Sequence, residues 1–286
     1  MNYISVIGGD KRIVELIKIL QENANNNIIV YGMENCNELE FNGILVKANN
    51  LQEAINSSEK IITSIPLSKD GIIVNSPYSN ETIYVKNIFE TAKNKKIITG
   101  NVTTEIEAQI ISNNKNEIID VLKFEELAVL NAIPTAEGAI QIAMEQSNIT
   151  LHNSNCLVMG FGRIGKILSK MLLGIGANVY CEARKTTDLA FIQALGYNVV
   201  DIKNIKEKLN KFNFIFNTIP HIILNEECLK IVKKDCCIID LASKPGGVDF
   251  EMANNLKLNT QWALALPGKV APKTSAKYIY EIIKDL

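Results

Sequence analysis

Arginine is scarce in this 286-residue sequence: only three of its 30 basic residues are arginine, and the others are lysine. Bidentate recognition of phosphates or carboxylates therefore has few candidate side chains, because a planar guanidinium provides that geometry and an ammonium group does not. An excess of one charge is also lacking, since 30 basic residues stand against 31 acidic ones. Long-range attraction to nucleic acid or to an anionic membrane is therefore not expected.

The sequence also lacks long apolar runs, a targeting segment and paired cysteine motifs. No uninterrupted apolar stretch approaches the roughly 18–20 residues of a membrane span. The chain begins directly with a strand-like pattern, without a basic segment followed by a cleavable apolar one. None of the six cysteines forms a CxxC pair or has histidine neighbours at metal-ligand spacing, so no metal site is expected. We expect a soluble cytoplasmic protein with no membrane or nucleic-acid partner.

Short apolar runs alternate with helix-like stretches along the whole length, which is typical of α/β folds with parallel sheets. At roughly 100–200 residues per domain, the length indicates two domains. The expected strands are Tyr3–Ile7, Asn27–Tyr31, Ile61–Ile65, Lys96–Thr99, Asn155–Met159, Ala177–Cys181, Phe212–Phe216 and Cys236–Asp240. The expected helices are Asp10–Gln21, Val85–Lys93, Thr103–Asn113, Lys166–Leu173 and Thr274–Asp285.

We place the domain boundary near Pro134. Pro134 and Thr135, followed by Glu137, have the pattern of a helix start, with Thr135 as the N-cap. The division predicts a substrate or catalytic domain over residues 1–133 and a dinucleotide-binding domain over residues 134–286.

The strongest motif is a glycine-rich turn between an expected strand and an expected helix. The turn reads Gly160, Phe161, Gly162, Arg163, Ile164 and Gly165. In the dinucleotide-binding fingerprint the first glycine permits a tight turn, the second admits a pyrophosphate, and the third lets the helix pack closely on the sheet. The phosphates then bind at the helix N-terminus. We therefore predict an α/β protein of two Rossmann-like, doubly wound parallel-sheet domains with an interdomain cleft.

The end of the second strand of this motif indicates which dinucleotide binds. Ala183 aligns with the position where NAD-selective sites carry an acidic residue, and Arg184 and Lys185 follow it. A small residue followed by two cations suits the 2′-phosphate of NADP. Glu182 leaves NAD open, because a shift of one residue would make it the selecting acid. We expect NADP as the cofactor.

Two later strand ends are expected to border the nicotinamide half of the cofactor, because ligands of doubly wound sheets bind beyond the carboxyl ends of the strands. The residues at these ends are Thr218, Pro220, Leu241, Ala242 and Ser243. A later segment, Ala265–Lys273, contains two prolines, one glycine and two lysines. We expect a loop of fixed shape that presents Lys269 to the cleft.

Several stretches of the sequence resemble the A-subunit family of dipicolinate synthase, whose members are sporulation enzymes of Bacillus and Clostridium relatives. The stretches are VIGGDKR (Val6–Arg12), AIPTAEG (Ala132–Gly138), GFGRIGK (Gly160–Lys166), GANVYCEAR (Gly176–Arg184), NTIPHIIL (Asn217–Leu224), IIDLASKPGGVDF (Ile238–Phe250) and LPGKVAPKTSA (Leu266–Ala276). The resemblance covers nearly the whole chain. The chain departs from the family pattern at Lys11, where a small residue is expected, and at His221, where serine is common.

The resemblance implies a reaction, a partner and a location. The reaction is the NADP-dependent oxidation of dihydrodipicolinate, or of a hydroxytetrahydrodipicolinate, to dipicolinate for spore formation. The implied partner is the flavoprotein-like B subunit of dipicolinate synthase, and the implied location is the cytoplasm of the mother cell. The sequence leaves the oligomeric state open, including a homo-oligomer.

A small dicarboxylate substrate requires cations or N–H donors. Arg163 and Arg184 are assigned to the cofactor, so Arg12 is the arginine that remains to bind a carboxylate, unless it is a solvated residue of the first helical turn. Lys269 and Lys244 are the next candidates.

Aromatising the substrate ring also removes a proton, which requires a base. Glu137 and His221 are the candidates, and capping of a helix is the structural alternative for Glu137. The catalytic residues expected are therefore Arg12, Glu137, His221 and Lys269.

Two other functions stay open from the residues alone. The first is an NAD(P)-dependent dehydrogenase of the 2-hydroxyacid or shikimate type, which would need a histidine–carboxylate pair in a recognisable motif. The second is a non-catalytic NADP-binding regulatory protein, since no base is obvious in the sequence.

Overall fold

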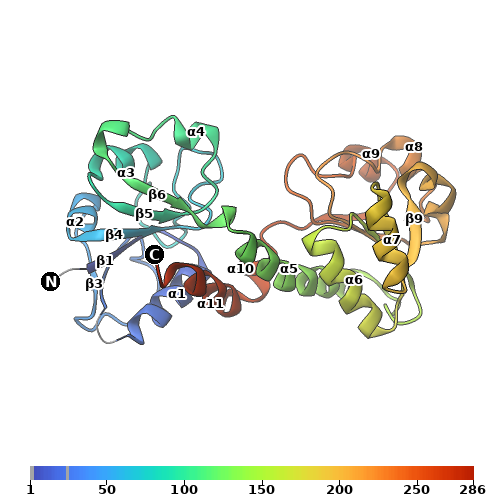
Figure 1. Ribbon diagram of the computed structural model, residues 1–286, viewed down its shortest axis with the longest axis horizontal. Helices are drawn as coiled ribbons and strands as arrows, with labels where there is room; N and C mark the ends of the chain where they lie inside the picture. Colours follow the sequence, from blue (N-terminus) through green and yellow to red (C-terminus); the bar gives the residue numbers. More distant parts are fainter. Residues whose placement is uncertain (1–2, 24–25) are drawn as a thin grey trace. The chain divides into compact units, whose positions relative to one another are not determined.

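The computed structural model describes residues 3–23 and 26–286, and the chain forms two compact units. Unit 1 comprises Met1–Ala128 and Ala271–Leu286, and unit 2 comprises Val129–Val270 (Figure 1). This division differs from the expected domains 1–133 and 134–286, because the carboxy-terminal helix belongs to unit 1. That helix, α11 (Pro272–Ile283), packs along α1 (Lys11–Gln21).

Unit 1 contains a parallel sheet of six strands in the order β3-β2-β1-β4-β5-β6. The strands are β1 (Tyr3–Ile7), β2 (Asn27–Tyr31), β3 (Leu45–Lys47), β4 (Ser58–Thr63), β5 (Lys96–Thr99) and β6 (Glu117–Asp120). The remaining helices of unit 1 are α2 (Leu51–Asn56), α3 (Val85–Thr91) and α4 (Thr104–Glu107), with 3₁₀ turns at Ser112–Asn114 and Val121–Lys123. The order is that of a doubly wound Rossmann sheet, whose switch point lies between β1 and β4.

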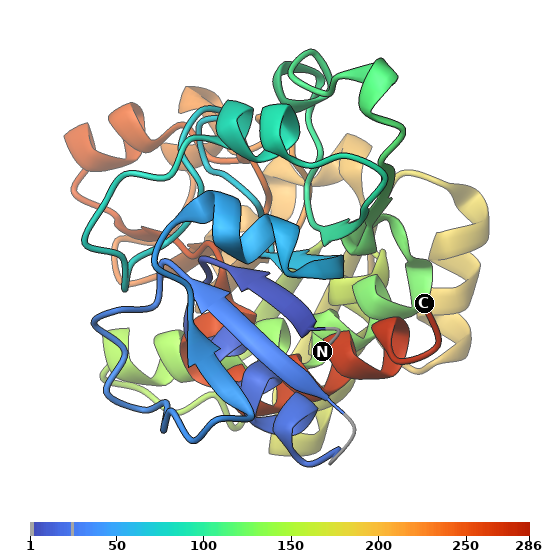
Figure 2. The same ribbon diagram turned by 90° about the vertical axis from the view of Figure 1, so that its left-hand side faces the viewer.

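Apolar side chains cover both faces of the unit 1 sheet. On one face, Val6 and Ile62 lie in a core cluster with residues of α1 and α11. On the other face, Ile7 and Ile61 lie in a cluster with residues of α2, α3 and α4. Figure 2 shows α1 and α11 on the same side of the blue strands. Alternate residues of a strand therefore point into the core layers on opposite faces of the sheet, as the strand geometry requires.

Unit 2 repeats the same topology with a sheet in the order β12-β11-β10-β7-β8-β9. The strands are β7 (Asn155–Met159), β8 (Asn178–Ala183), β9 (Asn198–Asp201), β10 (Phe214–Asn217), β11 (Cys237–Asp240) and β12 (Asn259–Trp262). The helices are α5 (Glu125–Gln146), α6 (Arg163–Ile175), α7 (Thr186–Ala194), α8 (Glu226–Leu229), α9 (Phe250–Asn255) and α10 (Leu266–Val270), with 3₁₀ turns at Ile202–Asn204 and Lys206–Lys211. Its switch point lies between β7 and β10.

Strand β7 shows how the unit 2 core is divided into two layers. Cys156 and Val158 face the cluster that contains residues of α5, α6 and α7. Leu157 and Met159 face the opposite cluster, with residues of α8 and α9. The predicted fold class, two doubly wound α/β units, is confirmed by this arrangement and by the two sheet orders.

Helix α5 corrects the predicted helix start at Pro134. The helix begins at Glu125 and continues through Pro134, and the Thr135 hydroxyl donates to the Asn131 carbonyl at 2.7 Å instead of capping the helix. A stripe of small buried residues, Ala132, Ala136, Ala139 and Ala143, recurs at helical spacing. Among the described residues, α5 is the one helix whose length and composition would allow it to cross a membrane, and half of its most apolar stretch is buried inside the protein.

The segment Ala265–Lys273 is not the expected loop. It contains α10, and α11 begins at Pro272. Both helices accommodate their prolines because Pro267 and Pro272 lie in the first turn, where a backbone N–H has no partner within the helix.

Candidate functional site

The glycine loop of unit 2 joins β7 to α6. Gly160 has φ +90°, which favours glycine, and a Cβ there would lie 2.9 Å from Cγ1 of Ile219. A Cβ at Gly165 would overlap the Gly160 carbonyl oxygen and lie 3.0 Å from its carbon. The fold itself therefore requires the first and the third glycine of the motif.

Gly162 differs from its two neighbours in the motif. It is the N-cap of α6 with φ −82° and ψ −159°, a conformation open to other residues, and no atom of the described residues beyond its two chain neighbours lies within 4 Å of where its Cβ would stand. The packing of the protein therefore does not explain why this position is glycine. Close approach of a ligand to the backbone does explain it, because a helix N-terminus with exposed N–H groups binds phosphate.

A pocket of about 390 Å³ lies at this loop, entirely within unit 2. The lining residues that concern the cofactor are Gly160, Gly162, Glu182, Arg184, Lys185 and His221. The side chains of Arg184 and Lys185 are exposed, whereas Ala183 is buried in the core with Phe161. Arg163 begins α6 and is exposed, and Ile164 packs against the same core.

Glu182 is the buried charged residue of this pocket. It pairs in register with Met159, and its Oε2 accepts a hydrogen bond from the Gly160 N–H at 3.1 Å. Its Oε1 has no hydrogen-bond partner among the described residues. Burial raises the pKa of the Glu182 carboxyl to about 7, with a smaller raising effect from Asp201, while the Gly160 N–H and Arg184 lower it. Glu182 therefore lies beneath the glycine loop, while Arg184 is presented to solvent.

The next strand end, that of β10, is tied to the glycine loop. The Thr218 hydroxyl donates to the Met159 carbonyl at 2.8 Å, and the Thr218 N–H donates to the same oxygen at 2.9 Å. Pro220 follows in an exposed turn. At the end of β11, Leu241 and Ala242 are buried. Ser243 is exposed.

A buried polar pair that the sequence reasoning missed shapes this second strand end. Asp240 Oδ1 accepts from Nδ2 of Asn217 at 2.7 Å and from the Ala242 N–H at 3.0 Å, and its Oδ2 accepts from the Gly247 N–H at 2.7 Å. The carboxylate thereby fixes the loop after β11. An aspartate that ends an apolar strand, with two glycines six and seven residues later, was the available signal.

The structure places the candidate catalytic residues in different surroundings. His221 is exposed and lines the dinucleotide pocket. Glu137 is exposed on α5 and lines a separate, largely apolar pocket with Ile140 and Met144. Lys269 is exposed on α10. Of the proposed bases, only His221 therefore shares the pocket with the glycine loop.

Arg12 is engaged inside unit 1 and is not a solvated first-turn arginine. Its Nη2 pairs with Asp10 Oδ2 at 2.7 Å and donates to the Ile65 carbonyl at 2.5 Å, and the residue is 7% exposed. Asp10 also caps α1 by accepting from the Arg12 N–H. The bond to Ile65 links α1 to the segment after β4, and a carboxylate ligand of Arg12 would have to compete with Asp10.

Two family models match the chain. The N-terminal domain of the dipicolinate synthase A subunit matches residues 3–122. The NAD binding domain of the D-isomer specific 2-hydroxyacid dehydrogenases matches residues 134–251, which include the glycine loop. The second match makes unit 2 the cofactor domain of an oxidoreductase and identifies the cofactor class as a nicotinamide dinucleotide.

Similar proteins extend this match to the whole chain. The dipicolinate synthase A subunit of Bacillus subtilis (strain 168) is 31% identical over 285 residues, which cover 99% of this chain and 95% of the relative. The crystal structure of the dipicolinate synthase A subunit from Bacillus halodurans has a TM-score of 0.89 at 28% identity, covering 99% of this chain and 97% of that one. The corresponding crystal structure from Bacillus subtilis has a TM-score of 0.87 at 30% identity, covering 99% and 95%. The chain belongs to the A-subunit family of dipicolinate synthase.

Proposed function

We propose that the chain oxidises dihydrodipicolinate to dipicolinate with NADP as the hydride acceptor. The reaction removes a hydride and a proton from the ring and yields NADPH. A hydroxytetrahydrodipicolinate substrate would in addition lose water. The proposal is supported by the similarity to the dipicolinate synthase A subunit and by a cofactor domain of the dehydrogenase type.

The open space at Gly162 is the observation that carries the proposal. The first and third glycines are needed for packing, but a Cβ on the second, at the N-terminus of α6, would contact no described residue beyond its chain neighbours. A pyrophosphate fits this position, because it can accept hydrogen bonds from the N–H groups of the loop and is stabilised by the helix dipole. The pocket of about 390 Å³ beside the loop leaves room for the adjoining ribose.

The cations beside the pocket support NADP rather than NAD. Arg184 and Lys185 are exposed where β8 ends and line the pocket, whereas the carboxyl of Glu182, which also lines it, is buried and accepts from the Gly160 N–H. A guanidinium can bind a phosphate through two parallel hydrogen bonds. When bound, the nicotinamide supplies the hydride chemistry, and this chain's residues bind and orient the reactants.

For the proton and the substrate carboxylates we propose the four residues expected from the sequence. His221 is the stronger candidate base, since it lines the dinucleotide pocket, and Glu137 is the weaker one. Lys269 is a candidate carboxylate ligand because it is exposed. Arg12 is a weaker one, since Asp10 already neutralises it.

The relatives are named as the A subunit of a synthase, and that name implies a partner subunit. We propose that the partner is a flavoprotein-like B subunit and that both act in the cytoplasm of the mother cell of a spore former. Neither activity nor partner binding depends on a metal ion in this proposal.

Substitution of Gly162 tests the cofactor site. Gly162→Ala should weaken NADPH binding about tenfold or more, because the new methyl group occupies the space of the pyrophosphate. Gly174→Ala on α6 is the matched control, since within the described part of the chain the new Cβ would likewise contact nothing outside its own helix backbone and chain neighbours. The NADPH affinity of both variants is measured by fluorescence titration. Equal affinities of the two variants would contradict the assignment of the pocket.

Substitution of Arg184 tests the choice between the two cofactors. Arg184→Ala should reduce NADPH affinity about tenfold or more and leave NADH affinity nearly unchanged, since only NADPH carries the 2′-phosphate. Equal losses for both cofactors would refute the NADP assignment.

An activity assay tests the reaction. The purified chain is mixed with NADP and freshly generated dihydrodipicolinate, with and without the B subunit, and NADPH formation is followed by absorbance. Formation of NADPH by the chain alone is the expected result. Activity only in the presence of the B subunit would instead indicate a regulatory or partner-dependent role.

A further inference from the structure

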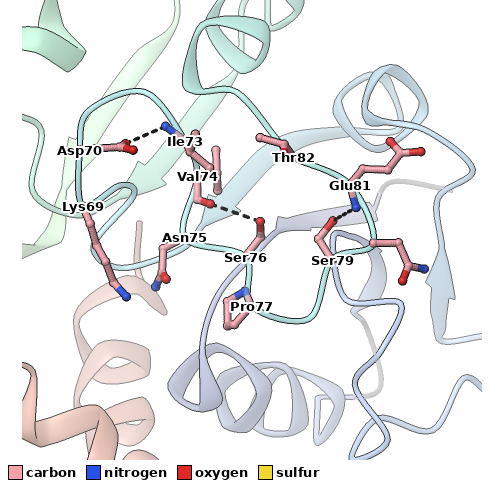
Figure 3. A pocket seen from close by; sticks show the side chains of 11 residues that line it. Lys69, Asp70, Ile73, Val74, Asn75, Ser76, Pro77, Ser79, Glu81 and Thr82 are labelled. Atoms are coloured by element: carbon pink, nitrogen blue, oxygen red, sulfur yellow. Dashed lines mark hydrogen bonds between the residues drawn. The ribbon is translucent and has the colours of Figure 1, made fainter.

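Unit 1 has its own pocket in the loop that packs on the end of β1, one of the two strands at the switch point of its sheet. The pocket has a volume of about 440 Å³ and is lined by the loop between Lys69 and Thr82 (Figure 3). Two residues of this loop touch the end of β1: the Asn75 carbonyl accepts from the Gly9 N–H at 2.9 Å, and a Cβ at Gly8 would lie 3.1 Å from Cβ of Ser76. Ligands of doubly wound sheets bind at such switch points.

The same contacts exclude a dinucleotide from unit 1. In the cofactor domain a ligand can approach the backbone of the glycine turn at Gly162. In unit 1 the Gly9 N–H already donates a hydrogen bond to the Asn75 carbonyl. The loop also covers Gly8 with Val74 and Ser76.

The loop holds a fixed shape through its own hydrogen bonds. The Leu67 N–H donates to the Gly100 carbonyl at 2.8 Å, and the Asn75 N–H donates to the Leu67 carbonyl at 2.8 Å. The Val74 N–H donates to the Ile83 carbonyl at 2.9 Å. A ligand would therefore meet a formed site, which reduces the entropy lost on binding.

Two of the three charged side chains that line the pocket are used within unit 1. Asp70 Oδ1 accepts from the N–H groups of Ile73 and Ile72, both at 2.9 Å, as the dashed line in Figure 3 shows for Ile73. These two bonds, with the Ser68 hydroxyl, lower the pKa of the Asp70 carboxyl to about 2. Glu81 Oε2 accepts from the Tyr31 hydroxyl at 2.9 Å.

The third charged side chain, Lys69, is exposed and has no ion-pair partner among the described residues. Figure 3 shows its side chain extending from the loop in the same direction as that of Asn75. The backbone N–H and carbonyl of Asn75 are both hydrogen-bonded, to Leu67 and Gly9. Its side-chain amide makes no hydrogen bond to the described part of the chain. That amide is therefore a second donor, and an ammonium group and an amide N–H together suit a carboxylate.

We propose that the loop pocket of unit 1 binds a carboxylate of the substrate through Lys69 and Asn75. The identity of the substrate rests on the function proposed above, whereas the location of the site rests on unit 1 alone. Lys69 and Asn75 position the ring by holding one carboxylate, and they take no part in hydride or proton transfer.

The test uses dipicolinate as the probe and isothermal titration calorimetry with the full chain. Lys69→Met removes the charge and keeps the length of the side chain, and Asn75→Asp adds a negative charge at nearly constant shape. Both variants should bind dipicolinate about tenfold more weakly or worse. Lys86→Met is the matched control, because Lys86 is an exposed lysine of unit 1 that pairs with Glu90 on α3. It should change the affinity less than twofold.

The outcomes separate this proposal from the function on which it rests. Dipicolinate affinity unchanged in both Lys69→Met and Asn75→Asp would overturn the carboxylate site, even if NADPH binds normally. Absence of dipicolinate binding to the unsubstituted chain at millimolar concentration would also overturn it. Displacement of dipicolinate by an equal concentration of inorganic phosphate would show a general anion site and contradict the assignment of the pocket to a substrate carboxylate. Failure of NADPH to bind would instead refute the proposed function.

Discussion

Substitution of the third glycine of the loop should separate the needs of the fold from those of the cofactor. In Gly165→Ala the new Cβ would lie 3.0 Å from the Gly160 carbonyl carbon and nearer still to its oxygen. Favourable carbon contacts begin at roughly 3.5 Å. The obstacle is backbone, which cannot rotate away as a side chain can, so α6 or the end of β7 must move by about 0.5 Å or more.

The expected cost follows from two opposing effects. Overpacking of this kind costs about 1–3 kcal/mol, and replacing a helical glycine with alanine returns up to about 1 kcal/mol. We therefore expect Gly165→Ala to lower the free energy of unfolding by about 1–2 kcal/mol. Gly174→Ala, which has open space around the new Cβ, should be neutral or should gain up to about 1 kcal/mol.

Urea unfolding followed by tryptophan fluorescence measures this difference within unit 2. The chain has one tryptophan, and Trp262 lies on β12, so the signal reports on the sheet that carries the loop. A shift of the midpoint to lower urea in Gly165→Ala, with an unchanged slope, is the expected result. If Gly165→Ala unfolded at the same urea concentration as Gly174→Ala, the reasoning from the carbonyl overlap would be refuted.

Three further substitutions test other parts of the structure. Asp240→Asn should destabilise unit 2 by about 1–3 kcal/mol in urea unfolding, because Asn217 and Gly247 donate to different carboxylate oxygens and the substitution turns one of these into an NH₂ donor; an unchanged midpoint would contradict the role given to this carboxylate. The pKa of Glu182, about 7, is raised above its ordinary value of 4.5, so the stability that its protonated form provides is present below pH 4.5 and is lost as the pH rises through 7. The free energy of unfolding of Glu182→Gln should therefore rise relative to that of the unsubstituted chain between pH 5 and pH 8, by at most about 3 kcal/mol. Parallel profiles of unfolding free energy against pH would refute this. Arg12→Ala should destabilise unit 1 by on the order of 3 kcal/mol in thermal unfolding, because it leaves a partly buried Asp10 without its partner; a loss below about 0.5 kcal/mol would mean that the pair is structurally idle.

The sequence predicted the inner strands of both sheets and missed the four outer ones. The missed strands, β3, β6, β9 and β12, are the edges of the two sheets. They are only partly buried: β6 and β12, for example, have no fully buried residue. An edge strand needs no continuous apolar run, because one side of it has no neighbouring strand. Periodicity therefore could not detect these strands.

The site was predictable where its signal is local and was not predictable where it depends on distant contacts. The glycine loop is a short motif, and its spacing together with the strand before it, the helix after it and the second strand at the right distance predicted a dinucleotide site. Arg12 pairs with Asp10, two residues away, but it also donates to the carbonyl of Ile65, 53 residues away, and that contact cannot be inferred from neighbours in the sequence. Pro134 suggested a helix start because proline favours first turns, although here it lies inside α5.

The covering of the unit 1 glycine turn by its own loop has a consequence for how the two units respond to heat. In unit 1 the glycine turn is covered by the protein itself, since the Gly9 N–H donates to the Asn75 carbonyl. In unit 2 the space at Gly162 is left for a ligand. A cofactor at about 100 times its dissociation constant stabilises the folded state that binds it by about 2.7 kcal/mol. Adding cofactor should therefore raise the melting temperature of unit 2 and leave that of unit 1 unchanged. Two units of the same topology would then differ in whether their thermal stability depends on a ligand.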